Sequence, residues 1–128
     1  MGRHRRSLGE KGERVAKESL IHQGYRVLVE NYSCPLGEID LVALDGETLV
    51  FVEVRTKTGG DFGPPQASVR IHKQRQIAKV AEFYMAEEGI REIDCRFDVV
   101  AVNLSPEGRL LNVEIIKDAF PREGHFTF

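Results

Sequence analysis

The chain has 128 residues, which is enough for one hydrophobic core and too short for two. Apolar residues make up 41% and charged residues 30%, so the composition is that of a globular domain and excludes a disordered chain. The net charge of −2 excludes tight, unspecific coating of DNA, although short basic clusters at Arg3 to Arg6 and Arg70 to Arg75 suit local phosphate contacts.

The first predicted element is an amphipathic helix from Ser7 to Gln23, preceded by a peripheral basic arm over residues 1–6. Gly24 is expected to end this helix, as glycine commonly does at that position. Glu13 lies at the edge of the apolar arc, so it is expected along the seam between the helix and a sheet. There it either reaches water or points toward a functional site.

Three strands are predicted next, one from Tyr25 to Tyr32 and two within residues 37–57. Asp45-Gly46 between the last two predicts a tight hairpin. With a two-residue turn there, the register places Glu38 opposite Glu53 and Asp40 opposite Phe51. Alternation along the strands then puts the hairpin's charged residues on one side of the sheet: Glu38, Asp40, Glu53, Arg55 and Lys57.

The hairpin carboxylates suggest a metal site. As diagonal neighbours, Asp40 and Glu53 would have Cβ atoms roughly 7 Å apart, close enough to share one divalent cation. Such a cation, with cationic side chains next to it, suits cleavage of a phosphodiester. The alternative is a solvated face on which the carboxylates only pair with Arg55 and Lys57.

The second half of the chain predicts a Gly- and Pro-rich loop over residues 58–65, a helix from Ala67 to Glu88 and two more strands. These strands run from Phe97 to Leu104 and from Leu110 to Ile116, and residues 119–128 form a peripheral tail. The loop either closes over a substrate or is a plain connector. The helical pattern places Arg70 and Lys73 within or beside the apolar arc. There they either reach the acidic site or a backbone phosphate, or extend from the edge of the core to water. The order helix, three strands, helix, two strands predicts one domain over residues 1–128 with a mixed sheet, of the α/β or the α+β class.

Cys34 and Cys95 belong to no Cys-x-x-Cys pair, and the four histidines have no zinc-ligand spacing. The sequence shows no apolar signal segment and no apolar run of about 18 residues. We therefore expect a cytoplasmic protein with free thiols and no membrane partner.

Several short motifs carry a resemblance to a known family. They are Gly12-Glu13-Arg14, Gly24-Tyr25, Asn31-Tyr32, Gly37-Glu38-Ile39-Asp40-Leu41, Phe51-Val52-Glu53-Val54-Arg55, Phe62-Gly63, Lys73, Ala81, Arg96-Phe97-Asp98-Val99-Val100 and Asp118-Ala119-Phe120. With them the chain resembles the bacterial YraN family, also called UPF0102, over nearly its whole length. That family is similar to archaeal Holliday-junction resolvases and to the restriction-endonuclease-like superfamily, whose nuclease pattern is Glu, then Asp, then Glu-x-Lys.

The resemblance implies a restriction-endonuclease-like α/β fold, with a central five-stranded mixed sheet flanked by helices. It implies a metal-dependent endonuclease that hydrolyses DNA, branched or structured DNA included, with Mg²⁺ or Mn²⁺ as cofactor and a homodimer as one assembly. Asp40, Glu53 and the Val54 carbonyl would hold the metal, and Glu13 would join them from the first helix. Asp98 is a further acid that the site does not require.

This chain departs from the pattern at Arg55, where the nucleases have lysine, and Lys57 is the nearest substitute amine. Arginine stays protonated and cannot act as a base, but it can orient a phosphate. Arg70 and Lys73 would contact neighbouring phosphates. The alternative function is a nucleic-acid-binding module that keeps the nuclease fold without cutting.

Overall fold

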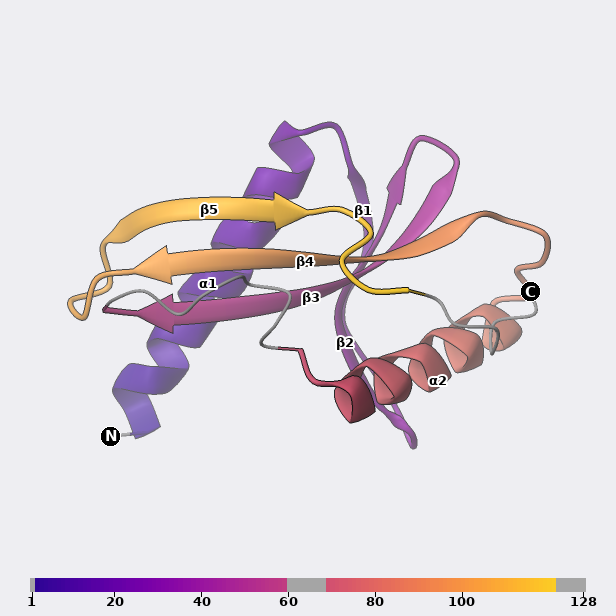
Figure 1. Ribbon diagram of the computed structural model, residues 1–128, viewed down its shortest axis with the longest axis horizontal. Coiled ribbons are helices and arrows are strands. Elements are labelled where there is room, and N and C mark those ends of the chain that lie inside the picture. The colour runs from indigo at the N-terminus through magenta and orange to yellow at the C-terminus, as the bar shows by residue number, and fades with distance from the viewer. Residues whose placement is uncertain (1, 60–68, 122–128) are drawn as a thin grey trace.

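The computed structural model describes residues 2–59 and 69–121, and Figure 1 shows two helices and five strands in that part of the chain. The elements are α1 (Gly2–His22), β1 (Arg26–Cys34), β2 (Gly37–Asp45), β3 (Thr48–Thr58), α2 (Ile71–Glu87), β4 (Cys95–Leu104) and β5 (Leu110–Ile116). This order confirms the predicted one, whereas the loop predicted over residues 58–65 and the tail lie largely outside the described residues.

The five strands form one mixed sheet in the order β1-β2-β3-β4-β5. β3 and β4 are parallel, and the other neighbouring pairs are antiparallel. A parallel pair needs a crossover connection, and α2 lies in the connection between β3 and β4. The α/β fold with a central five-stranded mixed sheet is therefore confirmed.

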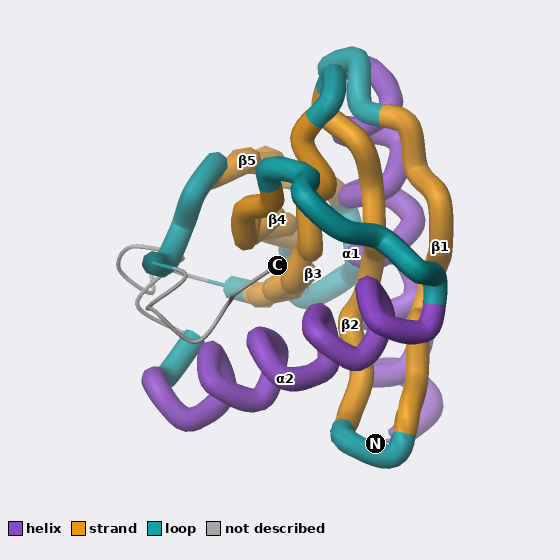
Figure 2. Tube along the Cα trace, turned by 90° about the vertical axis from the view of Figure 1, so that its right-hand side faces the viewer, coloured by secondary structure: helices purple, strands orange, loops and turns teal. Residues whose placement is uncertain are grey.

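The two helices cover opposite faces of the sheet (Figures 1 and 2). On one face, Ala16 and Leu20 of α1 pack against Val50 and Val52 of β3. The residues of α2 pack on the other face, where Phe51, Phe97 and Phe120 join the same cluster. The rings of Phe97 and Phe120 stack at a centroid distance of 5.0 Å, so the packed chain reaches beyond β5.

Helix α1 begins at Gly2, earlier than the predicted Ser7, so residues 2–6 continue the helix. Contacts with the turn after β4 hold this extension, because Lys11 Nζ donates to the Gly108 carbonyl and His4 Nε2 lies 3.1 Å from the Pro106 carbonyl oxygen. Further along, Gly12 is buried against Thr56, leaving no room for a Cβ atom. The missing side chain lets α1 approach β3 closely, which places Glu13 beside the end of that strand.

The predicted register of the hairpin was wrong by two residues. Asp45 pairs with Thr48, and Phe51 lies opposite Val42 instead of Asp40. The physical reason is the turn: Gly46, with φ of 63°, takes its first central position, as a type II′ turn requires, and Glu47 takes the second. A shift of two residues does not by itself move a side chain to the other face of a strand. However, Ile39 packs on the α2 face, so its neighbour Glu38 lies on the α1 face and not, as predicted, on the face of Glu53.

Within the described residues, no helix is both long and apolar enough to cross a membrane.

Candidate functional site

The β2–β3 ladder ends just before the two hairpin carboxylates. Its last pair is Leu41 with Val52, so Asp40 and Glu53 are the next residues on their strands. In place of regular pairing, the Asp40 carboxylate accepts a hydrogen bond of 2.7 Å from the backbone N–H of Val54. The corrected register thus brings Asp40 and Glu53 closer to direct opposition than the predicted diagonal arrangement.

Glu53 is one of few charged residues in the interior, with 8% of its surface exposed. Its neighbours along β3 show its direction: Val52 packs on the α1 face and Phe51 on the α2 face, so Glu53 and Arg55 share the α2 face. Arg55 Nη1 lies 3.7 Å from Glu53 Oε2. This contact is longer than a charge-assisted hydrogen bond, so it neutralises the buried carboxylate only partly.

The environment raises the pKa of Glu53 to about 7. Burial is the largest cause, and the negative charge of Asp40, which is hydrogen-bonded to Glu53, adds to it. Lys73 and Arg55 act in the opposite direction, which shows that both cations lie near this carboxylate. A buried acid next to a second carboxylate is the arrangement that a divalent cation would relieve.

Glu13 approaches Asp40 from α1. Burial raises its pKa, followed by the negative charges of Asp40, Glu10 and Glu38, and a hydrogen bond from the Asn31 side chain opposes the shift. Glu13 is half-buried, as expected for the seam between α1 and the sheet. Helix α1 and strands β2 and β3 therefore each contribute one acid to this acidic site, defined as Glu13, Asp40 and Glu53.

The predicted cations lie at different distances from the acidic site. Arg55 and Lys73 both interact with Glu53, and Lys57 follows Arg55 on the same face of β3. Arg70 is exposed directly before α2, and its extended backbone caps the helix without a side-chain hydrogen bond. Within residues 2–59 and 69–121, no contact between Arg70 and the three acids is seen.

Carboxylates alone do not complete a metal site here. Among residues 2–59 and 69–121, no three His, Cys, Asp or Glu side chains stand close enough to hold a metal ion together. Asp40 and Glu53 offer carboxylate oxygens, the type of ligand that Mg²⁺ and Mn²⁺ take, and such ions complete their shell with waters and phosphate oxygens. The third expected ligand, the carbonyl of Val54, belongs to the residue whose N–H binds Asp40. The donor set fits a hard divalent ion bound together with its substrate.

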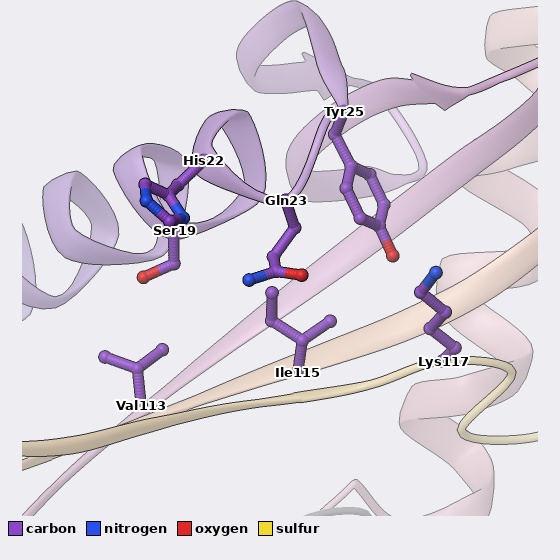
Figure 3. Close-up of a pocket in the computed structure, with 7 residues that line it drawn as sticks. All are labelled: Ser19, His22, Gln23, Tyr25, Val113, Ile115 and Lys117. Carbon is purple, nitrogen blue, oxygen red and sulfur yellow. The ribbon is translucent and has the colours of Figure 1, made fainter.

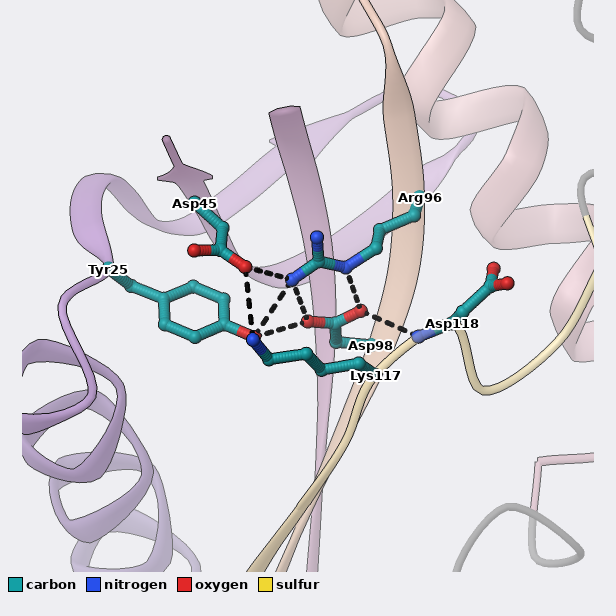
Figure 4. Close-up of polar contacts among 6 residues, drawn as sticks. All are labelled: Tyr25, Asp45, Arg96, Asp98, Lys117 and Asp118. Atoms are coloured by element: carbon teal, nitrogen blue, oxygen red, sulfur yellow. Dashed lines mark hydrogen bonds and ion pairs between the residues drawn. The ribbon is translucent and has the colours of Figure 1, made fainter. Parts of the chain in front are cut away.

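Asp98 lies in a second polar cluster, shown in Figure 4. It is fully buried and accepts hydrogen bonds from Tyr25 Oη at 2.7 Å, Arg96 Nε at 2.9 Å and the Asp118 N–H at 3.0 Å. Arg96 also binds Asp45 at 2.6 Å, which lowers the pKa of that carboxyl. With every acceptor position used, Asp98 joins α1's C-terminal turn, the hairpin and β4, and it is not part of the acidic site.

A pocket of about 580 Å³ lies next to this second cluster, between the end of α1 and β5 (Figure 3). Its lining is made of Ser19, His22, Gln23, Tyr25, Val113, Ile115 and Lys117. Lys117 also bonds Asp45 and lies 5.6 Å from the centre of the Tyr25 ring. None of the acids of the acidic site lines this pocket.

Sequence reasoning missed Asn31. It was assigned to a regular strand, yet its φ is 53° and its side chain bonds Glu13. The available signal was its residue type, since asparagine is among the few residues that adopt left-handed backbone at low cost.

Comparison with known proteins places these residues in a family. A family model described as "Uncharacterised protein family UPF0102" matches residues 12–102, which include all three acids of the acidic site. A UPF0102 protein of Moorella thermoacetica is 48% identical over 116 residues, covering 91% of this chain and 97% of that protein. A UPF0102 protein of Geobacter metallireducens is 45% identical over 120 residues, covering 94% of this chain and 97% of that protein. This chain is therefore a member of the uncharacterised protein family UPF0102.

Proposed function

We propose that this protein is a metal-dependent endonuclease that hydrolyses phosphodiester bonds of DNA. The observation that carries the proposal is that Glu13 of α1 and Glu53 of β3 both lie near Asp40 of β2, where the β2–β3 ladder ends. Folding leaves these like charges together, one of them buried, at a cost that a structural role does not explain.

Asp40, Glu53 and the Val54 carbonyl would hold Mg²⁺ or Mn²⁺. When bound, such an ion lowers the pKa of a coordinated water and neutralises charge on the phosphate. Glu53 must lose its proton to serve as a ligand, and its pKa of about 7 makes that loss easy near neutral pH. Glu13 adds a third negative charge from the α1 side and can accept a proton there.

The cations around the acids would bind the DNA backbone. Arg55 presents a planar fork of donors beside Glu53 and would orient the scissile phosphate. Lys57 would supply the amine that Arg55 cannot, while Lys73 and Arg70 would contact neighbouring phosphates. Branched DNA is the proposed substrate and a homodimer the proposed assembly, both from the resolvase resemblance.

A cleavage assay tests the proposal. Purified protein is incubated with labelled linear, single-stranded and four-way-junction DNA in Mg²⁺, Mn²⁺ or EDTA, alongside Asp40→Asn and Glu53→Gln. Glu47→Gln is the matched control, because Glu47 is an exposed carboxylate in the hairpin turn. We expect products that need the metal and disappear in the two site variants but not in the control. Metal-dependent cleavage that survives both site variants would refute the assignment.

The second candidate is a nucleic-acid-binding module that does not cut. Arg55 favours it, because its guanidinium occupies the position where the nuclease pattern has lysine. This function predicts DNA retardation in a gel that weakens with salt, ignores Mg²⁺ and survives Asp40→Asn. The same DNA panel therefore distinguishes the two candidates.

A further inference from the structure

Asn31 lies in β1 directly across from Asp40. The β1–β2 ladder pairs Glu30 with Leu41 and Tyr32 with Ile39, and the position between them, Asn31 with Asp40, is not paired. Asn31 has a left-handed backbone with φ of 53°, which few residues other than glycine adopt.

At this point, the side chains of both strands change the face of the sheet to which they point. Val29 and Tyr32 are three residues apart and would lie on opposite faces of a regular strand, yet both pack against the α2-side cluster. Ile39 and Val42 of β2 show the same break. Alternation thus fails on β2 at Asp40 and on β1 at its neighbour Asn31, in addition to the register shift that β1 has between Val27 and Val29. An irregularity shared by two strands can redirect a side chain toward a functional site.

The residue displaced by this irregularity is Asp40, which lies where the β2–β3 ladder ends. Released from pairing with β1, Asp40 turns to β3, where its carboxylate accepts the 2.7 Å bond from the Val54 N–H. The side chain of Asn31, which is exposed, meanwhile bonds the Glu13 carboxylate of α1. Asn31 therefore lies beside two of the three acids: it faces Asp40 across the interrupted ladder, and its side chain bonds Glu13.

We propose that Asn31 is a positioning residue of the acidic site. Its left-handed backbone frees Asp40 from the β1–β2 ladder, and its amide N–H holds the Glu13 carboxylate beside Asp40 and Glu53. The inference rests on the proposed nuclease function and adds the residue that fixes the relative placement of the acids.

The decisive variant is Asn31→Gly. Glycine accepts positive φ, so the backbone conformation at position 31 and the end of the β2–β3 ladder persist, while the side-chain amide is lost. Glu92→Gly is the matched control, because Glu92 also has φ of 53° and lies in the exposed segment before β4. Glu13→Gln and the double variant Asn31→Gly/Glu13→Gln complete a cycle. Each protein is examined by urea unfolding and by single-turnover cleavage across a range of Mn²⁺ and DNA concentrations.

We expect Asn31→Gly to unfold at the wild-type urea midpoint or above it, and to cleave about 10- to 100-fold more slowly at saturating DNA with unchanged KM. In the Glu13→Gln background, Asn31→Gly should cause little further loss, since the carboxylate that Asn31 positions is already gone. Glu92→Gly should cleave like wild type. Wild-type cleavage by Asn31→Gly, or losses that multiply in the double variant, would overturn the inference.

Failure of the nuclease function gives a different result. In that case the wild-type protein cleaves nothing under any condition, and the urea cycle decides whether Asn31 positions Glu13. If the shifts in urea midpoint of the two single variants do not sum to the shift of the double variant, the contact is supported. Shifts that do sum to it reject the contact.

Discussion

The raised pKa of Glu53 predicts that replacing this residue with glutamine stabilises the protein. An acid whose pKa is raised in the folded state favours folding below its unfolded pKa of about 4.5, and that advantage is lost as the pH rises through about 7. Above pH 7, the fold holds a buried charge that the unfolded chain keeps in water. Glutamine has nearly the same shape and no charge.

The magnitude follows from the shift of the pKa. A change from 4.5 to about 7 corresponds to about 3 kcal/mol of destabilisation at pH 8, since each pKa unit is worth about 1.4 kcal/mol. At pH 5.5 the same linkage leaves about 1 kcal/mol, because the folded carboxyl is then mostly protonated. Glu53→Gln should therefore be more stable than wild type, and its advantage should grow by about 2 kcal/mol between the two pH values.

Urea unfolding of both proteins at pH 5.5 and pH 8, without divalent metal, measures this difference. Glu47→Gln serves as a control for the loss of an exposed carboxylate. A Glu53→Gln protein that is less stable than wild type at pH 8, or an advantage that is equal at both pH values, would refute the electrostatic account of the acidic site. The Glu53 carboxylate would then stabilise the fold through favourable contacts, instead of carrying an unfavourable charge that a bound cation would offset.

Three other substitutions have expected outcomes. Gly12→Ala should destabilise the fold by about 1–3 kcal/mol in urea unfolding, because the new methyl would overlap Thr56, whereas Gly9→Ala in open space should stabilise it slightly. Equal effects of the two would reject the close helix–strand approach. Asp98→Asn should cost about 3 kcal/mol by thermal or urea unfolding, since it removes a fully buried charged partner of Arg96 and leaves the half-buried guanidinium with Asp45 alone; a cost below about 1 kcal/mol would contradict that account. Arg55→Lys restores the amine of the nuclease pattern and should raise single-turnover cleavage by at least about tenfold. An unchanged rate would mean that Lys57 already supplies this amine.

Local sequence patterns predicted the elements and the fold because each strand and helix follows its own periodicity. The Asp-Gly pair predicted the hairpin, and the apolar arcs predicted which helix faces are buried. The register needed one more fact, namely whether Gly46 takes the first or second central position of the turn. That choice depends on how the finished ladder packs, so it cannot be read from the pair itself.

The candidate site was predicted residue by residue but not as an arrangement. Asp40, Glu53 and Glu13 were identified from their unusual positions and the family resemblance, and folding brings them together. Asn31 was missed because its residue type, which tolerates left-handed backbone, does not tell where two strands interrupt their pairing. The role of Asp98 was also hidden, since its partners Tyr25 and Arg96 come from distant segments that meet only in the folded chain.

Titration of Mn²⁺ into the protein by calorimetry at pH 8 tests most directly whether Asp40 and Glu53 form one metal site. We predict one ion per chain for wild type and for Glu47→Gln, and greatly weakened binding for Asp40→Asn and for Glu53→Gln. Affinity should fall as the pH is lowered below about 7, because the proton on Glu53 then competes with the metal. Binding that is absent from wild type, or that is unchanged in both site variants, would contradict the proposed metal site.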